Sequence, residues 1–178
     1  MGFRLALPNK TAIRRPDLGV VCNNNPVSLE ANDRTYRGVY DMCIEALSDS
    51  SEKEVERDTV TKKEEYASVG VKEFYILHDS QKIAFYRLNA PGVYVPIKPV
   101  GQGIIKSKVL PGFQFRIADL YQKPSLKEMT EDKVYQGFIL PFYQEEKKAL
   151  EKKAREKEKK AEAKIKRLEA EMARLRKK

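Results

Sequence analysis

The chain has 178 residues, of which 41% are hydrophobic and 34% are charged. This length accommodates one domain with a hydrophobic core plus an appendage. No apolar stretch approaches the ~18 residues of a membrane-spanning helix, and residues 1–8 are too short an apolar stretch for a signal peptide. Cys22 and Cys43 lie within apolar runs, which favours buried free thiols over a disulfide or a metal site. We therefore expect a cytoplasmic protein that does not associate with membranes.

The net charge of +9 is concentrated at the C-terminal end of the chain. Residues 144–178 contain 15 Lys and Arg against 8 Asp and Glu, a net charge of +7 that leaves +2 for residues 1–143. A positive surface favours anionic partners such as nucleic acids. Because the body of the chain is nearly neutral, this argument applies only to the C-terminal segment.

The first half of the chain contains short strand-like segments. Residues 1–14 have apolar side chains on either side of a Pro-Asn-Lys break, which predicts a hairpin. Residues 16–22 and 40–48 are apolar runs that carry acidic residues, and we predict that both are buried strands. The strand period of two places Asp41 and Glu45 on one face of the second strand. Burying two carboxylates is costly, so the pattern suggests a function.

The next segment, residues 54–68, is charged and has a helix-forming composition. Asp58, Lys62 and Tyr66 are spaced by four residues and therefore lie on one stripe of the predicted helix. This spacing allows Lys62 to point toward the strands.

A phosphodiester is hydrolysed with a divalent cation on oxygen ligands and a positive charge near the phosphate. Asp17 and Glu45 could hold Mg²⁺, which suits carboxylates in a chain with a single histidine, and Lys62 could supply the charge. An alternative needs no catalysis. In it, Asp17 and Asp41 are turn residues that open strands, and Asp58 and Lys62 form a solvent-exposed pair worth about 0.3–0.5 kcal/mol.

The middle of the chain is predicted to alternate strands and turns after Gly70, which suits the end of the preceding helix. The first two strands form a hairpin, two prolines favour an edge position for the third, and the fourth closes the antiparallel part. In chain order, these strands are residues 73–78, 82–88, 93–100 and 104–115, and a short helical turn follows at residues 117–121.

The C-terminal part of the chain is predicted to be helical. Ser125 and Glu128 form a capping box for a helix that reaches about residue 137, and Pro141 breaks the apolar segment that follows. Residues 144–178 contain no Gly or Pro. Some of their apolar residues form a short coiled-coil seam: Ala161, Ile165, Leu168, Met172 and Leu175. A self-associating helix, a solvated single helix and a basic surface for phosphate all remain open.

An ordered set of motifs gives this pattern a family resemblance. The set consists of Arg15-Pro16-Asp17, Asp41-x-x-x-Glu45-x-x-Ser48, Asp58-x-x-x-Lys62-x-x-x-Tyr66 and the segment at residues 70–77. Together these motifs resemble the bacterial putative restriction endonuclease family of the PD-(D/E)XK nuclease superfamily. The similarity covers about residues 5–122, through Asp119-Leu120-Tyr121.

The resemblance implies a role for each matching residue. Asp17 and Glu45 correspond to metal ligands, Lys62 to the catalytic cation and Asp41 to a further acid, while Asp58 would orient Lys62. In such families the lysine can lie on the helix after the strand. Leu47 stands two residues after Glu45 in this chain, which favours Lys62.

The chain also departs from the family pattern. The second strand opens with Tyr40-Asp41 instead of Pro-Asp, and the turn at residues 48–51 lacks proline. The family normally has a helix with a glutamate and a further strand before the Arg-Pro-Asp motif, whereas fourteen residues precede Arg15. We therefore expect an N-terminally truncated core.

These observations lead to one set of expectations. We expect an α/β restriction-endonuclease-like core, with a mixed central sheet, a flanking helix and antiparallel hairpin additions, followed by a long C-terminal helix. The expected parts are residues 1–122, 123–143 and 144–178. The expected function is cleavage of DNA with Mg²⁺, or Mn²⁺ in its place, and a homodimer through the C-terminal helix is one arrangement. The alternative is an inactive nuclease-like protein that binds DNA or assembles through a coiled coil.

Overall fold

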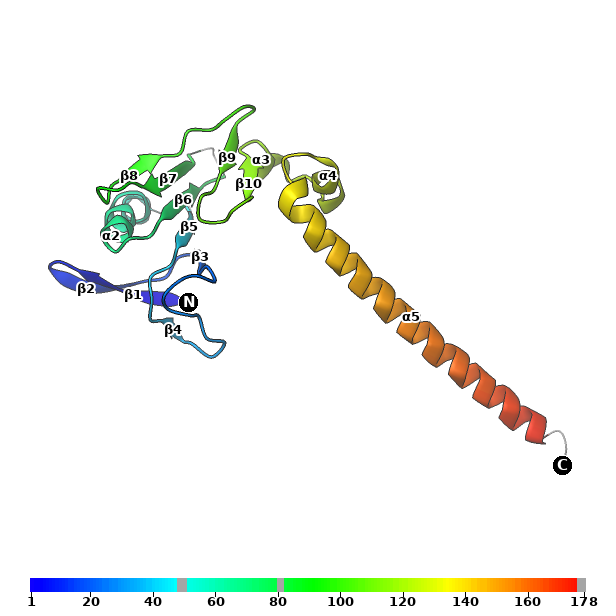
Figure 1. The fold of residues 1–178 in the computed structure, drawn as a ribbon. Helices are drawn as coiled ribbons and strands as arrows, with labels where there is room; N and C mark the ends of the chain where they lie inside the picture. The colour runs from blue at the N-terminus through cyan, green and yellow to red at the C-terminus, as the bar shows by residue number, and fades with distance from the viewer. Residues whose placement is uncertain (48–50, 80–81, 176–178) are drawn as a thin grey trace. The chain divides into compact units, whose positions relative to one another are not determined.

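The computed structural model describes residues 1–47, 51–79 and 82–175, in two units, Met1–Lys123 and Pro124–Lys178. The first unit contains a five-stranded sheet in the order β3-β5-β6-β7-β8 (Figure 1). Strands β5 and β6 are parallel and the other neighbours are antiparallel, so the predicted mixed sheet is confirmed. The strands are β3 (Leu18–Val20), β5 (Met42–Ala46), β6 (Glu73–Leu77), β7 (Ala84–Leu88) and β8 (Tyr94–Pro96).

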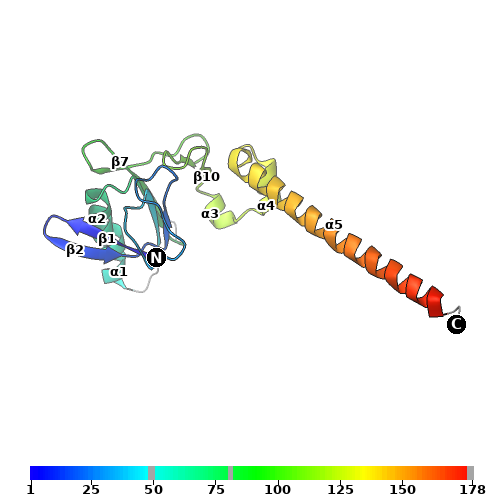
Figure 2. The same ribbon diagram turned by 60° about the horizontal axis from the view of Figure 1, so that its bottom comes forward.

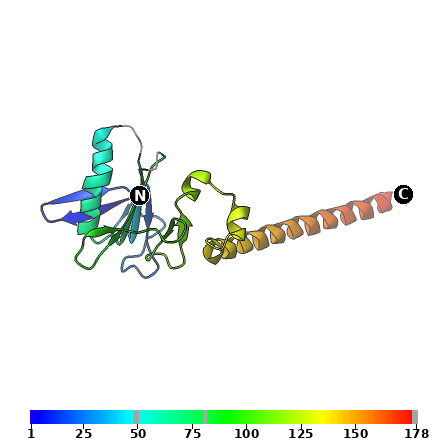
Figure 3. The same ribbon diagram turned by 90° about the horizontal axis from the view of Figure 1, so that it is seen from above.

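A continuous helical segment connects the two parallel strands (Figure 3). It consists of α1 (Glu52–Glu56), the π-helical turn η1 (Arg57–Thr61) and α2 (Lys62–Ser68). The helix ends as predicted, because Gly70 has a φ of 87° and the Val71 amide donates to the Tyr66 carbonyl. The sequence predicted the helix, but its π-helical turn was not expected.

A smaller sheet, in the order β2-β1-β4, packs beside α2 (Figure 2). It contains the predicted hairpin of β1 (Gly2–Leu7) and β2 (Lys10–Arg14), together with β4 (Thr35–Tyr36) in a segment expected to be a loop. Phe3 and Leu5 of β1 are fully buried in the core. On β2, Arg14 binds both carboxylate oxygens of Glu65 in α2, at 2.5 and 2.9 Å.

The central sheet has a hydrophobic cluster on each face. Cys43 of β5 lies in the cluster that includes β1 and α2, whereas Met42 lies in the cluster that includes Ile105 and Phe115. The second cluster is covered by a separate hairpin of β9 (Ile104–Lys106) and β10 (Gln114–Arg116), followed by α3 (Asp119–Gln122). The prediction that residues 104–115 form one strand that closes the antiparallel part is wrong, because they form a separate two-stranded sheet that packs on the face of the central sheet.

Two further predictions concern the turns and the first motif strand. The turns predicted at residues 48–51 and 79–81 lie largely outside the described residues. The segment at residues 16–22 was expected to be a buried strand, but β3 is short, and Leu18 is 55% exposed. This exposure follows from its place at the edge of the sheet, where β5 is its only neighbour within the described part.

The second unit consists of α4 (Leu126–Glu131) and α5 (Gln136–Leu175). The predicted capping box between Ser125 and Glu128 is present, although α4 ends before residue 137. The predicted break at Pro141 is wrong, because α5 continues through it. A proline inside a helix costs about 3 kcal/mol, and the long run of strong helix formers after it offsets this cost.

The described side chains of α5 do not test the predicted coiled coil. Ala161 and Ile165 are exposed, and the side chains of Leu168, Met172 and Leu175 lie outside the described part. Self-association through α5 therefore stays a prediction. Among the described helices, none combines the length and the apolar character that crossing a membrane requires.

Glu73 at the start of β6 is a buried carboxylate on the second face of the sheet. Its side chain is fully buried and accepts hydrogen bonds from the Tyr75 hydroxyl at 2.9 Å and the Ser107 hydroxyl at 2.7 Å. The Lys108 amide donates at 2.8 Å and the Arg87 guanidinium at 2.9 Å. Glu73 therefore joins β6, β7 and the segment that follows β9.

Removing this carboxylate should destabilise the first unit. We expect Glu73→Ala to lower the free energy of unfolding by about 3 kcal/mol, because it leaves the partly buried Arg87 guanidinium and three neutral donors without their acceptor. Urea unfolding followed by circular dichroism measures this change. The exposed Glu64 is the control, and Glu64→Ala should stay within about 0.5 kcal/mol of the wild type. Equal, small losses for both variants would contradict the structural role of Glu73.

Candidate active site

Glu45, near the end of β5, is the centre of the candidate site. Strand alternation places it on the same face as Cys43, and its side chain is almost completely buried, with 1% of its surface exposed. The Tyr66 hydroxyl donates to Glu45 Oε1 at 2.8 Å, and Lys62 Nζ lies 2.8 Å from Glu45 Oε2. Both carboxylate oxygens are therefore bound by side chains of α2.

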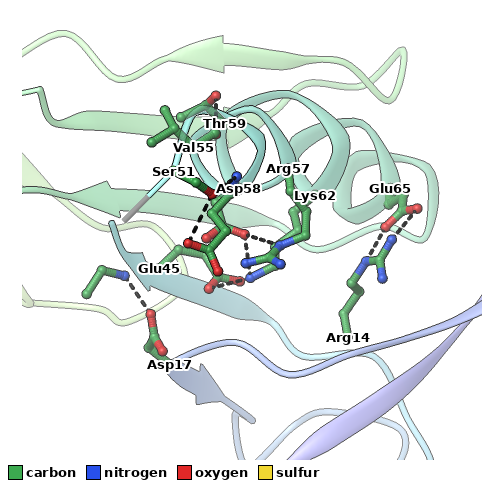
Figure 4. Close-up of polar contacts among 12 residues, drawn as sticks. Arg14, Asp17, Glu45, Ser51, Val55, Arg57, Asp58, Thr59, Lys62 and Glu65 are labelled. Atoms are coloured by element: carbon green, nitrogen blue, oxygen red, sulfur yellow. Dashed lines mark hydrogen bonds and ion pairs between the residues drawn. The ribbon is translucent and has the colours of Figure 1, made fainter. Parts of the chain in front are cut away.

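The ammonium group of Lys62 lies between two carboxylates (Figure 4). It is 2.8 Å from Glu45 Oε2 and 2.8 Å from Asp58 Oδ1, and Arg57 Nε contacts the same Asp58 oxygen at 3.1 Å. The side chains of Lys62 and Asp58 are only 9% and 13% exposed. This is a buried pair rather than the solvent-exposed one of the alternative explanation, and it agrees with the expectation that Asp58 orients Lys62.

The π-helical turn η1 lies directly before Lys62 and contains Asp58. The Lys62 amide donates to the Arg57 carbonyl, five residues back instead of the four of an α-helix. The wider turn changes the direction in which Lys62 and later residues point relative to α1. Such turns are frequent at functional sites.

Asp17 lies next to β3, at the same end of β5 as Glu45. The two strands are antiparallel with Leu18 opposite Ile44, so the next pair in this register would be Asp17 and Glu45. Asp17 Oδ2 accepts a hydrogen bond from the Ala46 amide at 2.7 Å (Figure 4), while its side chain is exposed. The structure thus joins Glu45 and Lys62 directly and places Asp17 at the same end of β5, bound to the amide of the next residue, Ala46.

Asp41 lies at the opposite end of β5, and its carboxylate has other partners. It is 2% exposed, and its oxygens accept hydrogen bonds from the Cys22 amide at 2.8 Å, Asn25 Nδ2 at 2.7 Å and Lys72 Nζ at 2.6 Å. Burial favours a higher pKa for Asp41, but these three donors outweigh it and hold the pKa below the usual range. The described contacts do not join Asp41 to Glu45.

The protonation states around Glu45 follow from burial. Desolvation raises the pKa of Glu45 above its usual range, and the hydrogen bonds from Lys62 and Tyr66 oppose this only in part. Burial and the Glu45 charge raise the pKa values of the Tyr66 hydroxyl and the Cys43 thiol. Tyr66 therefore remains a donor to Glu45 at neutral pH, and Cys43 is a free, protonated thiol, as expected from its apolar run.

The residues at this end of β5 suit a hard cation. Within the described part of the chain, no three His, Cys, Asp or Glu side chains are grouped to hold a metal ion. Mg²⁺ is commonly bound through one or two carboxylates and keeps several waters, so Asp17 and Glu45 fit it as a pair. Together with Asp58 they supply three negative charges against the two positive charges of Lys62 and Arg57, which leaves an excess that favours a cation.

Sequence reasoning missed two contributors to this site. Tyr66 was placed on the stripe with Lys62, but its hydroxyl was given no role; its spacing of four from Lys62 was the available signal. Arg57 lies beside Asp58 in the chain, and nothing in the residue spacing indicated that its side chain turns back to that carboxylate.

The pKa of Asp41 leads to a prediction about stability. Because the folded-state pKa lies below the ordinary 3.8, the charged form stabilises the fold above that pH, and this contribution is lost as the pH falls through the folded-state pKa. We expect Asp41→Asn to lower the free energy of unfolding by about 2 kcal/mol at pH 7 and by progressively less in acid. Urea unfolding at several pH values measures the difference.

Asp79 provides the control, because its side chain is 89% exposed. Asp79→Asn should change stability by less than about 0.5 kcal/mol. A loss for Asp41→Asn that stays constant down to pH 2.5, or grows in acid, would contradict this account.

A comparison with known families covers most of this unit. A family model described as Uma2, putative restriction endonuclease, matches residues 1–118 of the 178-residue chain. The matched part includes Asp17, Glu45 and Lys62, and it ends before α3. A search of curated proteins found no match.

Proposed function

The chain belongs to the Uma2 family of putative restriction endonucleases, and from this we propose that it is a magnesium-dependent endonuclease that hydrolyses phosphodiester bonds in DNA. The family supports nuclease activity with DNA as the substrate. The observation that carries the proposal for the site is the buried contact of 2.8 Å between Lys62 Nζ and Glu45 Oε2, at the end of β5 where Asp17 also lies. Carboxylates that could hold a metal ion, beside a positioned cation, suit the hydrolysis of a phosphodiester.

Asp17 and Glu45 are the residues that would hold the metal ion in this proposal. Bound Mg²⁺, or Mn²⁺ in its place, would polarise a phosphoryl oxygen and lower the pKa of a coordinated water. Glu45 approaches from the buried face and Asp17 from the exposed edge strand. In this proposal a substrate phosphate would reach the pair from the solvent side of Asp17, the exposed member.

Lys62 would act on the phosphate as a positioned charge. Its ammonium group carries three N–H donors, and the contacts with Glu45 and Asp58 account for two. Among the described residues the third has no partner, and in this proposal it donates to an oxygen of the scissile phosphate, where negative charge increases in the transition state. Because Lys62 is largely buried and fixed by two carboxylates, its orientation costs little during the reaction.

The surrounding residues have positioning roles in this proposal. Asp58 fixes Lys62, the Tyr66 hydroxyl fixes one oxygen of Glu45, and Asp41 holds the far end of β5 through its three hydrogen bonds. Such contacts hold a catalytic geometry fixed, because neighbouring residues restrain each side chain that takes part in the reaction.

Replacing Lys62 should separate cleavage from binding. We expect Lys62→Met to lower the rate of cleavage of a fluorescently labelled DNA duplex in Mg²⁺ by at least about 100-fold, because it removes the charge that faces the phosphate. Duplex binding in EDTA should change by only a few fold. Lys63→Met is the control, since Lys63 Nζ instead lies 4.2 Å from the centroid of the Tyr86 ring. Equal cleavage rates for both variants would contradict the assignment.

The raised pKa of Glu45 predicts the pH dependence of cleavage. Metal binding requires the carboxylate, so the rate should fall as the pH drops through the Glu45 pKa, at a higher pH than for an exposed glutamate. Tyr66→Phe removes a hydrogen bond that favours the charged form of Glu45. The pH below which the cleavage rate falls should therefore be higher still in this variant. A pH–rate profile of both proteins measures the shift, and an unchanged or lower acid limb in Tyr66→Phe would count against the role of Glu45.

A further inference from the structure

A pocket with both polar and aliphatic walls lies at the other end of the parallel strands, away from Glu45. It has a volume of about 710 Å³. Its lining includes the start of β6 with the loop before it, the end of β7 and the segment after β9. Glu73 at its base is paired in register with Met42, the first residue of β5. A strand rises about 3.3 Å per residue, so Glu45 lies roughly 10 Å along β5 from this end. The pocket is thus distinct from the candidate cleavage site.

Two buried carboxylates hold cations at this pocket. Asp41 Oδ1 lies 2.6 Å from Lys72 Nζ, and Glu73 Oε1 lies 2.9 Å from the guanidinium of Arg87. The proposed cleavage reaction brings neither carboxylate to the phosphate. Burying a carboxylate costs several kcal/mol unless it is paired, so these two positions are built around their cations. In each pair the cation is the more exposed partner and lines the pocket.

The pocket has an excess of positive charge and free donor capacity. Lys72, Arg87 and Lys108 line it and outnumber the carboxylates of Asp41 and Glu73. The side chain of Lys72 is 60% exposed, and its contact with Asp41 accounts for one of three N–H donors. Lys108 contributes its backbone amide to Glu73, and its side chain is exposed, so its ammonium group can extend to a ligand in the pocket. The pocket therefore favours an anion, and lysine ammonium groups commonly bind phosphate.

The remaining lining residues indicate what kind of group would be attached to the anion. One part of the wall is aliphatic, and the side-chain amides of Asn23 and Asn24 stand beside it; the aliphatic residues are Val21, Leu88, Val109, Leu110 and Pro111. An asparagine amide both donates and accepts, as the edge of a nucleobase requires. The volume is in the range of pockets that bind small organic ligands, roughly 300–1,000 Å³.

We propose that this pocket binds a nucleoside phosphate, with the phosphate at Lys72 and Lys108 and the base against the aliphatic wall near Asn23 and Asn24. A free mononucleotide and a nucleotide within a DNA strand present the same chemistry. In either case the ligand binds apart from Asp17, Glu45 and Lys62, and it binds without a metal ion.

Binding in EDTA tests the proposal independently of cleavage. We would titrate the full chain with inorganic phosphate, with each of the four 5′-deoxynucleoside monophosphates, and with a fluorescent single-stranded oligonucleotide. The variant Asn24→Ala/Lys108→Ala keeps the backbone amide that binds Glu73, and thermal melting verifies that it folds. The control is Lys106→Ala, since Lys106 is an exposed lysine two residues away that does not line the pocket.

The expected result is that the double variant weakens binding of at least one mononucleotide, or of the oligonucleotide, by tenfold or more, while Lys106→Ala stays within twofold. An effect on the mononucleotide identifies a free nucleotide as a ligand, and an effect on the oligonucleotide alone identifies a strand contact. Equal affinity for inorganic phosphate and for every nucleotide would overturn the proposal. So would nucleotide binding that the double variant leaves unchanged, or the absence of binding by all of these probes.

Discussion

The burial of Glu45 is the constraint on which the rest of the first unit depends. An isolated carboxylate in this position would cost several kcal/mol, and the two donors that offset this cost both come from α2. The connection between the parallel strands must therefore place Lys62 and Tyr66 over β5. The π-helical turn sets the direction of Lys62, and the salt bridge between Arg14 and Glu65 ties α2 to the N-terminal hairpin.

Local patterns in the sequence predicted much of this arrangement. Alternation indicated the strands, and the spacing of Asp58 and Lys62 indicated an ion pair on one side of a helix. The interactions that could not be predicted join residues far apart in the chain. Asp41 receives donors from two separate segments, residues 22–25 and Lys72, and Glu73 binds residues more than thirty positions later. The break expected at Pro141 failed because one residue's preference is outweighed by the long helix around it.

The two ends of β5 use buried carboxylates in different ways. At the carboxyl end, Glu45 has a raised pKa and lies near the exposed Asp17, so a divalent cation would stabilise its charged form. At the amino end, the donors around Asp41 lower its pKa, and Lys72 is presented to solvent. In the two proposals, the same short strand thus has a cation site at one end and an anion pocket at the other. The two ends differ because different side chains donate hydrogen bonds to each carboxylate.

Incubation of supercoiled plasmid with the purified chain tests the central claim most directly. The wild type in Mg²⁺ or Mn²⁺ should produce nicked and linear DNA, whereas the Glu45→Ala variant and the wild type in EDTA should leave the plasmid supercoiled. Cleavage by Glu45→Ala at the wild-type rate would contradict the proposed site. If a wild type that melts cooperatively leaves the plasmid intact in both metals, the chain is instead a catalytically inactive nuclease-like protein that binds DNA or assembles through α5.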